Sequence, residues 1–344
     1  MKRIVLFSMM CSFSLGLMAQ SDFSDVFAAG VEDTERFAND YFGPLSEAAI
    51  FSMGNGWYNS ADAKPLGGFE ISLIGNITGF KNKGDKKAFF FDEANYTNLQ
   101  LVGGSDARTD TQLVSSALGD IEGVRVFVEA EVGPGLPAQR QEFELPSGLA
   151  SEGLNFVPTA YLQASLGLIK GLEVKARFLP NINFDDDVEF GLFGAGLQYD
   201  FTKILPGDKI LPVAISAVIG YTNLNASYDF TDQGILAGED QRIETTFNTW
   251  TFAAVASTRL PIINFYGGFG YITGNSTTDV LGNYTAGIGP LSETVTDPFS
   301  IEREASGVTA NVGTKLKLGF FRLNVDYTIA EFSTLTAGIN FGFR

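Results

Sequence analysis

The stretch from Ala305 to Arg344 alternates between apolar and polar side chains, and this alternation limits the fold more than any other feature. In 334–343 one face carries the apolar residues Leu335, Ala337, Ile339, Phe341 and Phe343. Segments 308–318 and 321–329 alternate in the same way. A period of two is that of a β-strand with one apolar face and one polar face. Strands of about nine to eleven such residues, closed by an aromatic-rich strand, are typical of an outer-membrane β-barrel.

Segments with this pattern can be followed backward from the C-terminus. The clearer ones are 334–344, 321–329, 305–318, 263–273, 245–259, 211–225, 188–201, 172–180, 154–167 and 123–132, and the weaker ones are 110–119, 96–103, 87–93 and 67–79. Short connections alternate with longer polar ones, as the turns and outer loops of a barrel do. We therefore expect an all-β transmembrane barrel over 67–344, with both termini periplasmic. It would have about fourteen antiparallel strands, and roughly twelve or sixteen are the alternatives.

Residues 1–19 have the layout of a secretory signal peptide. Lys2 and Arg3 precede the apolar run 4–18, and Ala19 supplies a small residue at the expected cut. A signal for simple periplasmic release is the alternative. The sole cysteine, Cys11, lies in this run, and the chain has no histidine. The mature chain would therefore lack disulfides, thiol catalysis and histidine-centred catalysis, and we expect neither an enzyme nor a cofactor.

The charge and hydropathy of the chain limit its partners. The net charge is −17, which argues against nucleic acid as a partner. No internal segment has about eighteen consecutive apolar residues, so a helical membrane protein is excluded. The expected partners are outer-membrane lipid, a small hydrophobic ligand and another envelope protein.

Residues 20–66 do not alternate, and we expect them to form a helical plug, or hatch, for the barrel. Apolar residues recur at intervals of three and four between Phe23 and Ala38, which predicts an amphipathic helix. Pro44 is expected to end it, with a second short helix over 45–53. An irregular hatch motif follows, with Asn55, Trp57, Tyr58 and Asn59. The acids of the plug are Asp22, Asp25, Glu32, Asp33, Glu35, Asp40 and Glu47.

The alternation also predicts which charged side chains point into the lumen. They are Arg125, Glu129, Glu131, Glu173, Lys175, Arg177, Lys315, Lys317, Arg322 and Asp326. Bases outnumber acids in this set, whereas the plug is acidic. We hypothesise that the carboxylates of the plug contact these bases. In the alternative, the lumen charges pair across strands and the N-terminal region stays free in the periplasm.

Two groups of acidic residues have side chains suited to cation binding or to acid–base catalysis. Asp185, Asp186 and Asp187 are weak candidates for divalent-cation binding, because hard cations take clustered carboxylates. The alternative, which is more common, is that these acids are solvated in an outer loop and bind no cation. Glu129 and Glu131 would share a face and could act as an acid and a base, but lining of the lumen wall is favoured.

The plug, the asparagine-rich segment and the barrel together resemble the FadL-type long-chain fatty-acid transporters. That family carries Asn-Pro-Ala near its hatch, where this chain has Asn59-Ser60-Ala61. Segments similar to an uncharacterised family of Bacteroidota outer-membrane proteins are 27–30, 35–37, 41–45, 54–59 and 67–69. The resemblance implies passive transport of small molecules, hydrophobic ones included, across the outer membrane. The alternative is a non-transport role as a structural or partner-binding subunit of a larger assembly.

Overall fold

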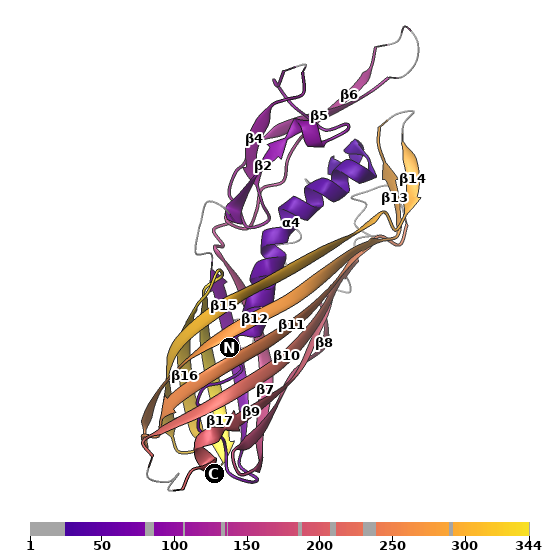
Figure 1. Ribbon diagram of the computed structural model, residues 1–344. Helices are drawn as coiled ribbons and strands as arrows, with labels where there is room; N and C mark the ends of the chain where they lie inside the picture. The colour runs from indigo at the N-terminus through magenta and orange to yellow at the C-terminus, as the bar shows by residue number, and fades with distance from the viewer. Residues whose placement is uncertain are drawn as a thin grey trace.

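A closed barrel of antiparallel strands holds an N-terminal helix, and small sheets stand above it (Figure 1). The computed structural model describes residues 25–79, 86–105, 107–131, 135, 137–184, 188–206, 211–229, 239–288 and 292–343. The expected signal peptide over 1–19, the plug acid Asp22 and the acidic cluster Asp185–Asp187 lie outside the described residues.

Ten strands form the barrel. They are β1 (Phe69–Gly79), β7 (Phe156–Ile169), β8 (Leu172–Phe184), β9 (Val188–Asp200), β10 (Val213–Asp229), β11 (Arg242–Thr258), β12 (Ile263–Leu281), β15 (Phe299–Leu318), β16 (Phe321–Ile329) and β17 (Thr334–Phe343). β1 closes the ring, because it pairs with β17 on one side and with β7 on the other. The barrel end that holds Phe69, Phe343 and the short connections is called the turn end. The opposite end is called the loop end.

The expected count of about fourteen barrel strands is wrong for the described residues. Segments expected to span the membrane instead form β2 (Ala88–Asp92), β3 (Gln100–Leu101), β4 (Thr111–Ser115) and β5 (Arg125–Ala130). With β6 (Gln139–Glu144) and η2 (Glu93–Asn95), they build two small sheets over the loop end, called the cap (Figure 1). Each strand of the cap has six residues or fewer, which is too short to cross a bilayer. The weakly patterned segment 67–79 becomes β1 instead.

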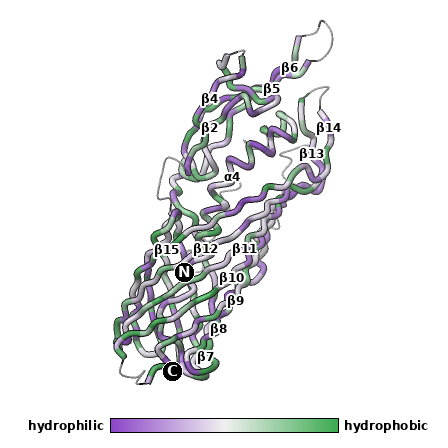
Figure 2. The backbone as a smooth tube through the Cα atoms, viewed as in Figure 1, coloured by the Kyte–Doolittle hydropathy of each residue, from purple (hydrophilic) through white to green (hydrophobic). Residues whose placement is uncertain are grey.

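The barrel is apolar on its outer face and polar on its inner face. Along β17, Ile339 and Phe341 are exposed, whereas Thr336 and Asn340 are fully buried. Hydrophobic and hydrophilic residues alternate in this way along the barrel strands (Figure 2). No helix among the described residues has the length and hydropathy of a membrane span. An exposed apolar belt around a polar interior is the reverse of a water-soluble barrel.

The helix α4 (Val31–Gly54) follows η1 (Phe27–Ala29) and runs without interruption for 24 residues. The break expected at Pro44 is therefore wrong, although the helix changes direction part-way along its length (Figure 1). A proline removes one backbone donor and bends a helix, but packing can hold both halves in place. Arg303 of β15 supports this region by donating to the carbonyl of Asn39 at 2.7 Å. Gly43 leaves room for that guanidinium, since a Cβ there would lie 2.6 Å from Arg303 Nε.

α4 belongs to two apolar cores at once. Its first half packs Phe37 and Tyr41 against the cap, in a cluster that includes Leu99 and Val126. Its second half enters the barrel, where Phe51 joins a cluster with Ile272 and Phe332. The hairpin of β13 (Asn283–Ala286) and β14 (Glu293–Thr296) also contacts the N-terminal region, with Tyr284 stacked on Phe27 at 5.0 Å. One helix thus connects the cap to the interior of the barrel.

Candidate functional site

The last carbonyl groups of α4 accept hydrogen bonds from the barrel wall and from the residue that follows the helix. The Asn55 side chain donates to the carbonyl of Phe51 at 2.7 Å, and the Asn76 side chain donates to that of Ser52 at 2.9 Å. Thr251 of β11 donates to the carbonyl of Gly54 at 2.8 Å. These carbonyls have no partner within a helix and cost free energy when they are buried unpaired. The barrel wall therefore acts as the C-terminal cap of this helix.

Arg177 of β8 completes this arrangement and is almost wholly buried. Its Nη1 donates to the carbonyl of Met53 and its Nη2 to that of Asn55, each at 2.7 Å. Its guanidinium lies 3.6 Å from the ring centre of Trp57 and 4.4 Å from that of Tyr161. A cation at the negative end of the helix dipole is stabilising, and aromatic rings add a further attraction. Arg177 thus fixes the plug by binding its backbone.

Trp57 occupies a shelf of glycines on the inner wall of the barrel. A Cβ at Gly196 of β9 would lie 2.7 Å from indole Cζ3, and one at Gly220 of β10 would overlap the indole ring. Gly56 has a φ of 78°, which a residue with a side chain rarely adopts, so the turn before Trp57 also needs glycine. The inward glycines therefore mark where the plug contacts the wall.

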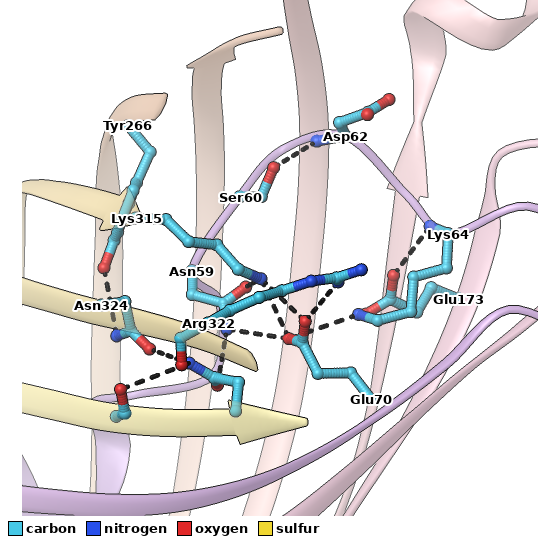
Figure 3. Close-up of polar contacts among 12 residues, drawn as sticks. Asn59, Ser60, Asp62, Lys64, Glu70, Glu173, Tyr266, Lys315, Arg322 and Asn324 are labelled. Atoms are coloured by element: carbon cyan, nitrogen blue, oxygen red, sulfur yellow. Dashed lines mark hydrogen bonds and ion pairs between the residues drawn. The ribbon is translucent and has the colours of Figure 1, made fainter. Parts of the chain in front are cut away.

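A cluster of charged residues fills the turn end of the lumen around Glu70 of β1 (Figure 3). Glu70 accepts from Lys315 at 2.9 Å and from Arg322 at 2.7 Å. The plug takes part, because Asn59 donates to Glu70 at 3.0 Å and accepts from Lys315 at 2.8 Å. Lys64 lies 3.7 Å from the same carboxylate. One buried carboxylate thus joins three bases and the hatch motif.

Glu173 of β8 forms a second centre beside the first. It accepts from Lys64 at 3.0 Å and from Lys175 at 2.7 Å. Burial lowers the pKa of Lys64, but the carboxylates of Glu173 and Glu70 raise it more, so this pKa lies above that of an ordinary lysine. The stabilisation from Lys64 is therefore complete below the ordinary lysine pKa of about 10.4 and is lost as the pH rises through the higher folded pKa.

A cavity of about 240 Å³ lies between these charged residues and the plug. The bases on its wall are Lys64, Lys175, Lys315, Lys317 and Arg322, and the acids on its wall are Asp62 and Glu173. Asp62 of the plug is paired with Lys203 at 2.7 Å and with Arg259 at 3.2 Å. Lys203 belongs to η3 (Phe201–Ile204) and is not part of the cavity wall. This space is called the turn-end cavity.

Most of the lumen charges expected from the sequence lie inside the barrel. Glu173, Lys175, Arg177, Lys315 and Asp326 are buried, and Lys317 and Arg322 are partly exposed beside the cavity. Asp326 accepts from Tyr266 at 2.7 Å.

The expected inward positions of Arg125, Glu129 and Glu131 are wrong. β5 lies in the cap rather than in the barrel wall, and Arg125 pairs there with Glu142 at 3.0 Å. Glu129 and Glu131 are exposed.

The hypothesis that the plug carboxylates contact these lumen bases is also wrong in the described residues. The described acids lie before α4 or along it as far as Glu47, whereas the bases lie beyond the C-terminal end of the helix, deep in the barrel. Asp33 accepts backbone N–H groups of the cap at Asn98 and Leu99, at 2.6 and 2.9 Å, and Glu47 pairs with Lys86 at 2.6 Å. Asp40 lies 3.7 Å from Arg303, while Asp25, Glu32 and Glu35 are exposed. Helix carbonyls, rather than carboxylates, meet the buried base Arg177.

Sequence reasoning assigned no role to several residues of the site. Glu70 could have been found from the alternation of Glu70, Ser72, Asn76 and Thr78 in the segment 67–79. The glycines of the shelf also fit the alternation, since Gly194, Gly196 and Gly220 occupy inward-facing positions of their strands. The partner of the shelf was not evident, because Trp57 belongs to an irregular segment without a strand pattern. It lies in the lumen, together with the buried hatch residues Asn55 and Asn59.

A family model matches residues 1–343 and carries the description "Family of unknown function (DUF6588)". The chain belongs to the DUF6588 family. No curated protein matches this DUF6588 member in sequence.

Solved structures that match this DUF6588 member share little sequence with it. The outer membrane protease OmpT from Escherichia coli has 9% identity and a TM-score of 0.32, over 83% of this chain and 100% of that chain. An outer membrane channel from Pseudomonas putida F1 has 9% identity and a TM-score of 0.29, over 83% and 99%. Ail, the attachment invasion locus protein of Yersinia pestis, has 10% identity and a TM-score of 0.25, over 81% and 99%.

Replacement of Arg177 by Met should loosen the plug, because it removes the charge-assisted hydrogen bonds to the carbonyls of Met53 and Asn55. We expect the docking of the plug to lose roughly 3 kcal/mol. In a Trp250→Phe background Trp57 is the remaining tryptophan, and its fluorescence emission should shift to longer wavelength. Arg125→Met, which removes an exposed arginine of the cap, is the matched control. An unchanged emission in Arg177→Met would contradict this role.

Replacement of Gly220 by Val should also displace Trp57, here because the new side chain occupies the place of the indole. Adding Trp57→Ala to Gly220→Val should restore protease resistance to residues 55–66, since the smaller residue makes room. Gly75→Val serves as the control, because a Cβ there has no neighbour closer than 4.0 Å. Equal protease sensitivity in Gly220→Val and Gly75→Val would rule out the steric explanation.

Proposed function

We propose that this protein is an outer-membrane β-barrel that passes small molecules passively, with residues 31–66 as a displaceable plug. In this proposal the apolar belt contacts outer-membrane lipid, and the turn end with the C-terminus faces the periplasm. The proposal includes no catalytic step. Passive passage requires that the plug leave at least part of the lumen, so the contacts between plug and wall decide whether it is feasible.

The polar attachment of the plug at the turn end carries this proposal. Hydrogen bonds and ion pairs to Arg177, Glu70, Lys315 and Thr251 hold the segment from Gly54 to Lys64. Its apolar contacts with the wall are made by Trp57, Tyr58 and Ala61. Water can replace the hydrogen bonds when the plug moves, and because most of them involve a charged group the net cost of each exchange is about 1.5–3 kcal/mol. The wall that remains is hydrophilic, as the lining of an aqueous channel is.

The range of molecules is a finer part of the proposal. The resemblance to FadL-type transporters and to Bacteroidota outer-membrane proteins extends the range to hydrophobic molecules. Such a molecule would contact the apolar layer around Phe51, Ile272 and Phe332, at the level where the second half of α4 enters the barrel. Below that layer it would meet the charged turn end, which favours hydrophilic solutes.

A disulfide between the plug and the wall tests whether the plug must move. Ser60 of the plug and Ser257 of β11 have their hydroxyl oxygens 3.3 Å apart, and the sole native cysteine is Cys11. We expect Ser60→Cys/Ser257→Cys protein to conduct ions across a planar lipid bilayer after reduction and to be silent when it is oxidised. Each single-cysteine variant is a control and should respond to neither treatment.

Two outcomes of this experiment would contradict the proposal. Equal conductance in the oxidised and reduced states would show that a displaced plug is not needed. Absence of conductance from reduced, correctly folded protein at every voltage would argue against passive transport. Heat-modifiable migration on a gel shows whether the barrel is folded in each sample.

A second candidate function, as a partner-binding subunit of a larger outer-membrane assembly, is favoured by an apolar pair on the cap. Phe90 of β2 and Leu113 of β4 are neighbours across the two strands, and they are 75% and 44% exposed. An exposed aromatic residue beside an aliphatic one is typical of a binding surface for another protein.

Replacement of both residues tests the partner-binding role separately from transport. We expect Phe90→Ser/Leu113→Ser protein to lose an envelope protein that co-purifies with the wild type and to keep its conductance. Val102→Ser, at another exposed apolar position near the cap sheets, is the control. Retention of the same partner by the double variant would contradict docking at this pair.

A further inference from the structure

We propose that the turn-end cavity binds a small multivalent anion of the phosphate class. The cavity has a volume of about 240 Å³ and lies between the plug segment 59–65 on one side and β8, β15 and β16 on the other. This space is large enough for one small oxyanion with its water. The site would exist whether or not the barrel conducts, so the inference does not rest on the proposed function.

The charge of the cavity wall is unbalanced in favour of bases. Five bases and two acids line it, which leaves an excess of three positive charges. If Glu70, which lies just behind the wall, is included, the excess is two. The whole chain carries a net charge of −17, so this local excess is opposite in sign to the protein around it. Uncompensated charges that are removed from water are costly, and a bound dianion would neutralise them.

The acids of the wall are already neutralised by other contacts. Glu173 is held by Lys64 and Lys175, at 3.0 and 2.7 Å. Asp62 is held by Lys203 and Arg259, and Arg259 also pairs with Asp200 at 3.1 Å. Each carboxylate therefore has two bases beside it and opposes an incoming anion little.

Donors of the wall also remain available for a ligand. In the part of the chain that the structure describes, the Lys317 side chain forms no hydrogen bond and no ion pair within 4 Å. Arg322 uses Nη1 for Glu70, while its Nη2 forms no hydrogen bond to the described residues. A lysine ammonium has three donor hydrogens, and the Lys175 ammonium has Glu173 as its hydrogen-bond acceptor. Charge-assisted bonds from several such donors to one oxyanion are the strong kind.

The chemistry of the wall favours a compact hydrophilic anion over an amphiphile. Beside the charged groups stand the amide of Asn59 and the hydroxyl of Ser60. The apolar layer around Phe51 lies farther toward the loop end and is not part of this wall. The apolar residues of the wall are Ala63 and Pro65, which are too few to cover the chain of a fatty acid. A phosphate group would satisfy the donors in all directions.

Binding of inorganic phosphate to the full mature protein in nanodiscs tests this inference. We expect isothermal titration calorimetry at pH 7 and constant ionic strength to show one saturable site, for which sulfate competes. Lys317→Gln should weaken phosphate binding about tenfold or more, because it removes one charge-assisted donor. Since Lys317 has no partner in the described structure, this variant should keep the thermal stability of the wild type.

Lys170→Gln is the matched control, because it removes the same charge from an exposed lysine of the turn between β7 and β8, outside the cavity wall. It should leave the affinity for phosphate within about threefold of the wild type, given the screening of more distant charges. Absence of saturable phosphate binding would overturn the inference. Equal weakening in Lys317→Gln and Lys170→Gln would do so too, as it would indicate general electrostatic attraction. Tight binding of laurate that phosphate does not displace would assign the cavity to an amphiphile instead.

Discussion

The arrangement of the whole protein depends on how the barrel receives the C-terminal end of α4. A helix that ends inside a protein exposes carbonyl groups that must find donors, and here Asn76, Arg177 and Thr251 of the wall provide them. This requirement fixes the depth and the rotation of the helix. Once the depth is fixed, Trp57 reaches its glycine shelf and Asn59 reaches Glu70. The turn-end cavity is the space that remains below.

The repeating part of the fold could be read from the sequence, because a membrane strand needs a long alternating segment. Nine of the clearer segments became barrel strands, and the inward positions of Glu173, Arg177 and Lys315 followed from the same period. The strand count failed where alternation alone was used. The alternation in segment 123–132 is as regular as that of a barrel strand, yet the strand that forms there, β5, is only six residues long. Length, more than pattern, separates the cap from the barrel.

The site could be predicted only in part, because its contacts join segments that are distant in the sequence. The inward bases were identified, but their partners were assigned to the acids of the plug by charge alone. Backbone carbonyls carry no signal in the sequence, so the role of Arg177 could not be foreseen. Glu70 and Lys315 are likewise 245 positions apart, and the closure of β1 on β17 brings them together. Pairing of the first and last strands thus creates the charged cluster.

The continuity of α4 has a mechanical consequence. Its first half is part of the core of the cap and its second half is part of the core of the lumen, so force applied to one core reaches the other through a single rod. At about 1.5 Å per residue the rod transmits an axial pull over a distance comparable to the thickness of a bilayer. Pro44 removes one backbone hydrogen bond inside this helix and makes it easier to bend there. A contact made by the cap is thereby connected to the interior of the lumen without passing through the barrel wall.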